Sequence, residues 1–182
     1  MYKILVGLFF ISVNYYMNID GLRVGILPDF IGYFLIGWAL KELEDEATHF
    51  KAARGAVRVM MIASIVMYIL EIMEIINGGM IARFLGGMLG VTYMAVEFVY
   101  LVMYAYITYL LTLGMQEIGY DEDMDDDGIM TAWKWVFGTK AFYYCCILIS
   151  GYLPYLSQVT TAAVLVALAF YMVQFFKCAK RY

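Results

Sequence analysis

Three carboxylates interrupt long apolar stretches of this chain, where they could do chemistry. They are Glu71, Glu74 and Glu97. An ionised side chain inside lipid needs a partner, a polar cavity or a proton. The positions that share a helix face with Glu97 by i, i+3 and i+4 spacing are Tyr93, Tyr100 and Tyr104. A carboxylate among tyrosines can be satisfied by phenol hydroxyls, or it can form the anionic floor of an aromatic site for an organic cation.

Further polar residues occur at the same predicted ends of the apolar segments. They are Asn14, Asp20, Arg23, Asp29 and Arg83. Together with the three glutamates, five carboxylates face two arginines, which leaves three excess negative charges if all are ionised. We therefore predict an outward-facing acidic and aromatic site that binds a small cation or amine, with Glu97 as the main anion and Glu71 as the second.

A purely structural interpretation competes with this one. Glutamates near a helix end can reach water or pair with Arg23 and Arg83, and this interpretation is favoured for Glu74. Desolvation can also keep a carboxyl group protonated. Asn14 can serve as a hydrogen bond between helices. For the deeper Glu97 the functional interpretation is preferred.

An acidic segment resembles the start of a calcium-binding loop. Residues 123–128 read Asp-Met-Asp-Asp-Asp-Gly, which matches D-x-D-x-D-G. The twelfth position is Lys134, where a bidentate glutamate belongs. A solvated acidic loop over residues 119–131 is the better interpretation, and Asp123, Asp125 and Asp127 are weak candidates for a divalent cation.

Enzyme signatures are missing from the sequence. The single histidine, His49, cannot build a zinc site with two or three imidazoles. No G-x-S-x-G motif occurs. We expect no catalytic residues and no cofactor, and the lack of a basic stripe argues against nucleic acid as a partner.

The composition indicates a protein of the lipid bilayer. Hydrophobic residues make up 64% of the 182 residues, against about half in a soluble domain. A spanning helix needs about 20 apolar residues. The sequence therefore predicts one all-α integral membrane domain with about six transmembrane helices, over residues 4–19, 28–43, 56–76, 88–113, 133–150 and 159–176. The first is expected to be an uncleaved span, and the second, led by Pro28, is either short or re-entrant. Residues 41–55 are expected to form a helical connector and residues 80–87 an interfacial lead-in.

Lysine and arginine placement supports this count. With six spans and the N-terminus inside, the outer side receives only Arg23 and Arg83, as the positive-inside rule requires. Lys140, near the start of the fifth span, is expected to reach the inner side too, and Trp133 and Trp135 fit an aromatic belt there. We expect a multi-pass protein of the inner or plasma membrane with both termini cytoplasmic.

Gly86 and Gly90 have the GxxxG spacing that lets membrane helices approach closely. Packing within the fold is the favoured use, and a homo-oligomer or a membrane-protein partner is the second. The possibility of a membrane partner leaves an alternative function open, in which the protein is a non-transporting assembly or scaffold subunit.

One segment carries a family resemblance. Residues 18–20 (Asn-Ile-Asp) and 27–33 (Leu-Pro-Asp-Phe-Ile-Gly-Tyr) resemble a signature of small uncharacterised membrane proteins of Firmicutes-type bacteria. The resemblance implies a multi-span bacterial membrane protein and no activity. Size and span number are also similar to the substrate-binding subunits of energy-coupling-factor vitamin transporters, in architecture only. In physical terms, Pro28 fixes a helix start, Asp29 complements the helix dipole and Gly32 permits close packing.

Overall fold

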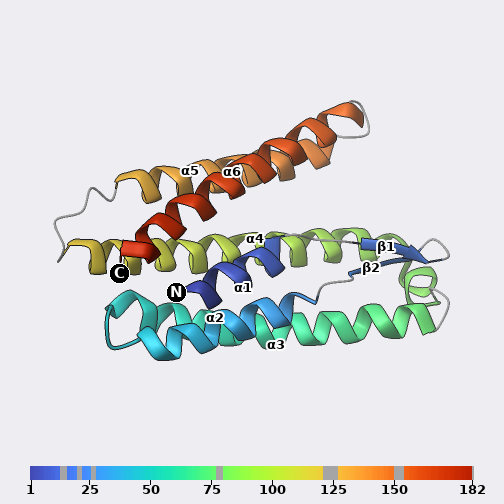
Figure 1. The fold of residues 1–182 in the computed structure, drawn as a ribbon. Helices are drawn as coiled ribbons and strands as arrows, with labels where there is room; N and C mark the ends of the chain where they lie inside the picture. Colours follow the sequence, from blue (N-terminus) through green and yellow to red (C-terminus); the bar gives the residue numbers. More distant parts are fainter. Residues whose placement is uncertain are drawn as a thin grey trace.

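The computed structural model describes the backbone of residues 1–12, 16–19, 22–25, 28–76, 80–120, 127–149 and 154–181. This part of the chain forms six helices and one antiparallel hairpin (Figure 1). The elements are α1 (Tyr2–Ser12), β1 (Tyr16–Ile19), β2 (Leu22–Gly25), α2 (Asp29–Leu43), α3 (Thr48–Ile76), α4 (Met80–Tyr120), α5 (Asp127–Ile149) and α6 (Pro154–Arg181). The predicted helical class is confirmed.

Among the described residues, three segments are long and apolar enough to cross a membrane. They are Thr48–Leu70 in α3, Phe98–Ile118 in α4 and Gln158–Lys180 in α6. Many large apolar side chains on these segments point outward, among them Val59, Ile62, Val66, Phe98 and Val166. Lipid covers such a surface without the cost that water would impose. The predicted membrane class is therefore supported, and the count of six spans stays a prediction.

The prediction of a helical span over residues 4–19 is wrong. Helix α1 ends at Ser12, and its 11 residues reach about 16 Å at 1.5 Å per residue, about half of a hydrocarbon core. The chain then enters a hairpin in which Tyr16 pairs with Gly25 and Ile19 pairs with Leu22. In the sequence, Asp-Gly separates the paired residues Ile19 and Leu22, and this dipeptide is the strongest short hairpin signal, although it lies outside the described residues.

Helix α2 follows the predicted range closely, but the connector after it does not form. Pro28 precedes α2 with φ −67° and Asp29 occupies the first turn, as predicted. At 15 residues, α2 reaches about 22 Å, which is shorter than a bilayer core. Instead of a helical connector over residues 41–55, a short turn leads directly into α3 at Thr48, eight residues before the predicted start.

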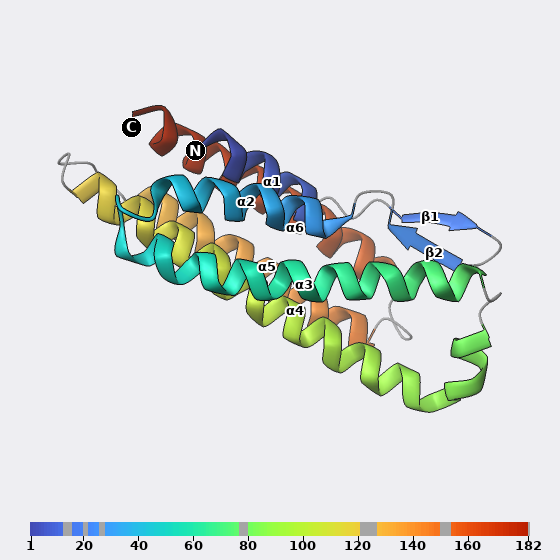
Figure 2. The same cartoon turned by 90° about the horizontal axis from the view of Figure 1, so that it is seen from below.

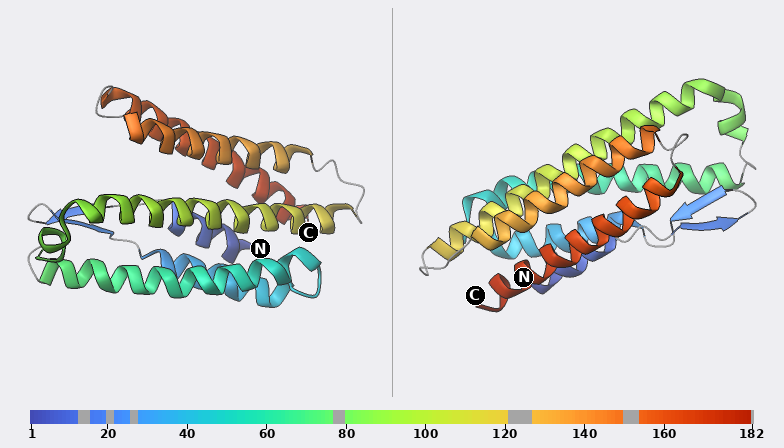
Figure 3. Two further views of the ribbon diagram at one scale, coloured as in Figure 1. Left: turned by 180° about the vertical axis from the view of Figure 1, so that it is seen from behind. Right: turned by 90° about the horizontal axis from the view of Figure 1, so that it is seen from above.

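Helices α4 and α5 are longer than predicted and include residues at both ends of the predicted acidic loop. Residues 80–120 are one helix of 41 residues, about 62 Å long, rather than a lead-in and a span of residues 88–113. Figures 2 and 3 show its first turns bent away from the rest. Residues 119, 120 and 127–131 of the predicted loop are helical, because α4 ends at Tyr120 and α5 begins at Asp127, and the rest of the predicted loop lies outside the described residues. Helix α6 likewise begins earlier, at Pro154, a residue suited to a first turn.

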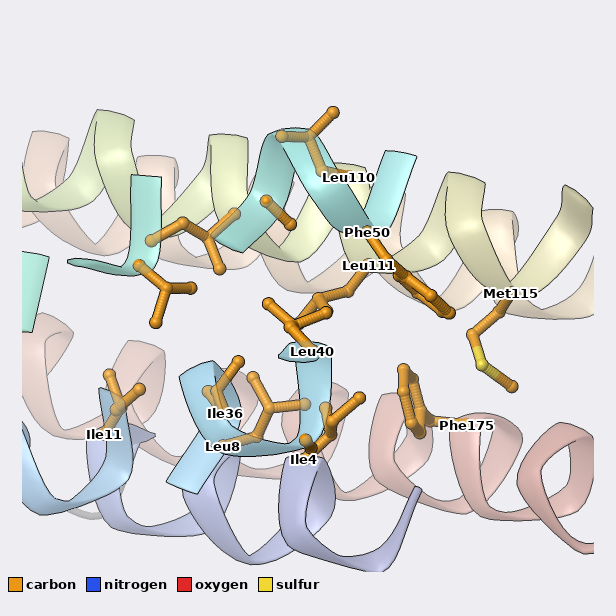
Figure 4. Packing of buried hydrophobic residues seen from close by; sticks show 14 of the residues in the cluster. Ile4, Leu8, Ile11, Ile36, Leu40, Phe50, Leu110, Leu111, Met115 and Phe175 are labelled. Carbon is orange, nitrogen blue, oxygen red and sulfur yellow. The ribbon is translucent and has the colours of Figure 1, made fainter. Parts of the chain in front are cut away.

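The helices form an inner group, α1 to α4, with the antiparallel pair α5 and α6 laid against it (Figures 1 and 3). A shared apolar core joins all six helices of the described part of the chain. Its largest fully buried side chains include Ile4, Leu8, Ile36, Leu40, Phe50, Leu111 and Phe175 (Figure 4). The two short helices cross at glycines, because a Cβ atom on Gly32 would lie 2.6 Å from the carbonyl oxygen of Gly7. The close packing predicted at Gly32 is confirmed.

Both chain termini and the α2–α3 turn lie at one end of the bundle (Figure 1). The ring of Tyr2 makes an edge contact with Phe176 near the end of α6, with centroids 5.9 Å apart. The three ion pairs among the described residues occur here too, between Lys3 and Glu42, His49 and Glu117, and Arg54 and Glu44. The hairpin, the end of α3 and the start of α4 lie at the opposite end (Figure 1).

Candidate functional site

Tyr104, one of the predicted wall residues, is the centre of a polar cluster inside the bundle. It is buried on α4, with a side chain exposed by only 6%. Its hydroxyl lies 3.1 Å from the Ser12 hydroxyl at the end of α1. Because an unpaired hydroxyl away from water is costly, this bond fixes both side chains where α1 ends. Ser12 was not among the predicted site residues.

Lys140 on α5 is the second member of the cluster. Its Nζ lies 3.4 Å from the centroid of the Tyr104 ring, which places an ammonium group over an aromatic face. In the structure its ammonium group contacts an aromatic ring between helices, and the expectation that Lys140 reaches the inner side of the membrane stays a prediction. Helix α5 starts at Asp127, so Lys140 lies 13 residues, about 20 Å, along it.

Two further aromatic residues and one carboxylate border the cluster. Tyr33 of α2 is fully buried, within electrostatic reach of Asp29, Tyr100 and Tyr104. Tyr100 packs against the apolar core, and Asp29 is half-buried in the first turn of α2. The structure therefore brings together Asp29, Tyr100 and Tyr104 of the predicted set.

The structure describes the backbone but not the side chains of the predicted anions, which are all on helices. Glu97 and Tyr93 are on α4 and Glu71 and Glu74 on α3. The helical repeat places position 97 on the face of α4 that carries Tyr100 and Tyr104. Because α4 begins at Met80, position 97 lies about 26 Å from the start of the helix, not about 13 Å as the predicted start at residue 88 implied.

The remaining predicted residues are described in part or not at all. Arg83 is on α4 and Arg23 on β2, both with backbone only. Asn14 and Asp20 lie outside the described residues. The structure describes Gly86 and Gly90 in α4 by their backbone only, so a role of their GxxxG spacing in helix packing or oligomerisation stays a prediction.

A second polar network, which the sequence analysis missed, joins α4 to α5 and α6. Thr108 Oγ1 accepts a bond of 3.1 Å from Nε1 of Trp133. The Tyr171 hydroxyl lies 3.0 Å from Thr112 Oγ1 and donates to the carbonyl of Thr108 at 3.3 Å. The i, i+4, i+8 spacing of Tyr104, Thr108 and Thr112 was the available signal. Trp133 therefore points toward α4, whereas Trp135 is 61% exposed, and the aromatic belt stays a prediction.

Glu117 forms a third polar contact where α3 begins. Its carboxylate accepts bonds from the backbone amide of Thr48 at 3.1 Å and from that of His49 at 3.4 Å, and from the Thr48 hydroxyl at 2.9 Å. Nδ1 of His49 lies 2.8 Å from the same carboxylate. A residue of α4 thus caps α3 by satisfying its unpaired amides. This explains the only histidine as a structural residue.

Nothing in the described part of the chain gathers three side chains able to hold a metal ion. Asp123 and Asp125 lie outside the described residues, and Asp127 is the first residue of α5, described in its backbone only. The divalent-cation hypothesis for these aspartates stays a weak prediction.

The Tyr104 cluster offers hydroxyl groups, an aromatic face and an ammonium group, within a shell of apolar helices. Such groups bind and orient a polar solute. Comparison of the chain with protein-family models, with curated proteins and with solved structures finds no match. The residues themselves therefore carry every functional argument.

Proposed function

We propose that this chain is a membrane component that binds or transports a small cationic solute or amine, at the cluster around Tyr104. The single observation that supports this function most is the Lys140 ammonium over the Tyr104 ring. This contact supports the proposal because it puts an ammonium group against this aromatic face between the helices. An amine of the solute would take the place that Lys140 occupies in the structure.

The position of the cluster between several elements suits a solute that passes through. Ser12 belongs to α1, Tyr104 to α4 and Lys140 to α5. A ligand held between helices can change how they pack, which is the basis of alternating access in transporters. Tyr104 lies 13 residues from Glu117, about 20 Å along α4, and is therefore well inside a 30 Å core if Glu117 marks one membrane boundary.

On the same assumption that Glu117 marks one boundary, position 97 would lie near the opposite boundary. Glu97 lies 20 residues, about 30 Å, from Glu117 along α4. A carboxylate at that depth can meet water on one side and the aromatic cluster on the other. We propose Glu97 as the entrance anion, which attracts the cation before it reaches Tyr104.

The ammonium group of Lys140 would compete with the amine of a solute for the Tyr104 ring. With Lys140 over Tyr104, a solute amine must displace a tethered cation whose effective concentration is high. Removing the lysine charge should therefore strengthen amine binding, whereas an anion-binding site would lose affinity with the same change. This difference in sign separates the two kinds of solute.

The experiment is a thermal-stability screen of the purified protein in detergent against amines, amino acids, vitamins and cations, with matched variants. An amine that stabilises the wild-type protein should lose its effect in Glu97→Gln and Tyr104→Leu and should act at lower concentration in Lys140→Met. Tyr106→Leu, an exposed position on the same helix, is the control. A ligand that binds Glu97→Gln and Tyr104→Leu normally contradicts the proposed site, and a ligand lost in Lys140→Met contradicts the proposed charge of the solute.

The scaffold alternative makes a different prediction. No amine would then stabilise any variant, and a membrane partner would co-purify in a manner that depends on Gly86 and Gly90. Substitution of these two glycines by leucine separates the hypotheses, because both positions are distant from Tyr104 along α4.

A further inference from the structure

A groove of about 510 Å³ runs along the outer face of the α5–α6 pair. It is lined by Thr131, Lys134, Trp135, Gly138, Phe142 and Ala163, with Thr139 and Thr160 between them. The bundle-facing residues Ala132 and Val136 of α5 are buried, so the groove lies on the opposite side of that helix. It is separate from the Tyr104 cluster and does not depend on the proposed function.

The surroundings of the groove indicate what fills it. One wall belongs to Gln158–Lys180, a segment long and apolar enough to cross a membrane. The accessible surface of the groove is almost entirely apolar, although threonines and Lys134 contribute to its lining, and the lining residue Phe142 is exposed. In the hydrocarbon region water has no favourable place in such a groove, whereas an acyl chain gains contact along its length.

One end of the groove carries the features of a headgroup site. Lys134 lies seven residues from the start of α5, about 10 Å, and Phe142 lies about 12 Å farther along the helix. Next to Lys134, Trp135 is 61% exposed, and Trp with Lys is typical of a membrane boundary. Among the described residues none forms an ion pair with Lys134. The groove thus leads from a positive charge at the boundary into the apolar region.

We propose that this groove binds one anionic phospholipid from the leaflet on the side of the chain termini. The phosphate lies at Lys134, and one acyl chain follows the groove past Gly138 to Phe142. Charge complementarity selects the headgroup, because Lys134 attracts net negative charge and repels the amine of a zwitterionic lipid. The absence of a side chain at Gly138 leaves room for the acyl chain, since a Cβ atom built there meets no atom within 4 Å.

Gly138 also provides a sharp test. Gly138→Leu puts a side chain into the groove from a position where the Cβ atom meets no atom within 4 Å, and leucine favours a helix more than glycine does. Gly55→Leu is the matched control, because its Cβ atom also meets nothing within 4 Å and it lies on α3. Lys134→Gln removes the charge alone, with Lys51→Gln on α3 as its control.

The measurement is native mass spectrometry of the full chain, delipidated and then titrated with phosphatidylglycerol or with phosphatidylcholine. The wild-type protein should retain one phosphatidylglycerol. Gly138→Leu should weaken that binding by about tenfold, since displacing two methylene groups is sufficient. Lys134→Gln should reduce the preference for the anionic lipid by about fivefold. Both controls should bind as the wild type does.

Three results would overturn the proposal. Equal retention of phosphatidylglycerol by Gly138→Leu and the wild type would exclude the groove as the binding site. Equal affinity for both lipids in the wild type would exclude recognition of the headgroup. A dimer that replaces lipid binding and disappears in Gly138→Leu would identify a second copy of the chain as the occupant.

Discussion

The ammonium group of Lys140 lies 3.4 Å from the centre of the Tyr104 ring, so that a cation of α5 is held against an aromatic residue of α4. The same tyrosine is bonded through its hydroxyl to Ser12 of α1. One side chain thereby connects three helices through an aromatic face and an oxygen atom, and changes at each partner should be distinguishable.

A double-mutant cycle should detect the contact between Lys140 and Tyr104. Lys140→Met and Tyr104→Leu are combined, and the free energy of unfolding in detergent is measured for each variant. A coupling energy of about 0.5–2 kcal/mol is expected for a cation over a desolvated ring. The cycle of Lys140→Met with Tyr106→Leu should give additive effects, because Tyr106 is exposed. Additivity in both cycles would mean that the lysine and Tyr104 do not interact.

Substitution of Gly32 by alanine should destabilise the protein. The added Cβ atom would lie 2.6 Å from both the carbonyl oxygen of Gly7 and a side-chain carbon of Ile11, so α1 and α2 must separate. Overpacking of this kind costs about 1–3 kcal/mol, which thermal unfolding would detect. Gly37→Ala is the control on the same helix, since its Cβ atom would meet Val57 at an ordinary 3.4 Å. If both variants unfold at the wild-type temperature, α1 and α2 do not pack in close contact at Gly32.

Replacement of Glu117 by alanine should weaken the start of α3. The change removes the acceptor of the amides of Thr48 and His49. A lost cap costs about 0.5–2 kcal/mol, and hydrogen exchange should increase first at the start of α3. Glu46 is an exposed carboxylate in the preceding turn, so Glu46→Ala should leave the stability and the hydrogen exchange of α3 unchanged. Exchange that increases equally throughout the protein would contradict a local cap.

Cysteine labelling should place the two ends of the bundle on opposite sides of the membrane. In a protein with Cys145, Cys146 and Cys178 replaced by alanine, Asp45→Cys should react only from the inside and Arg23→Cys only from the outside. The reason is that the α2–α3 turn, which contains Asp45, lies at the same end of the bundle as the termini, whereas β2, which contains Arg23, lies at the opposite end (Figure 1). The same side for both cysteines would exclude a crossing by the chain between them.

Much of the local structure could be predicted from the sequence. The apolar runs determined the helices and the membrane class, because only a helix satisfies its own backbone groups in lipid. Pro28 determined the start of α2, since its ring fixes φ and its position needs no amide donor. The Asp-Gly pair after Ile19 also determined a hairpin, and the expectation of one long span concealed it.

The tertiary structure decided which residues meet. Helical periodicity puts Tyr100 and Tyr104 on one face of α4, but it contains no information on which neighbour supplies a partner. Lys140 could equally have extended toward water, as the positive-inside pattern suggested, and only the start of α5 at Asp127 and its packing against α4 direct it to Tyr104. The same holds for Glu117 and Thr48, 69 residues apart. The period of a helix is set by its own backbone, whereas contacts between helices are set by how whole faces fit together.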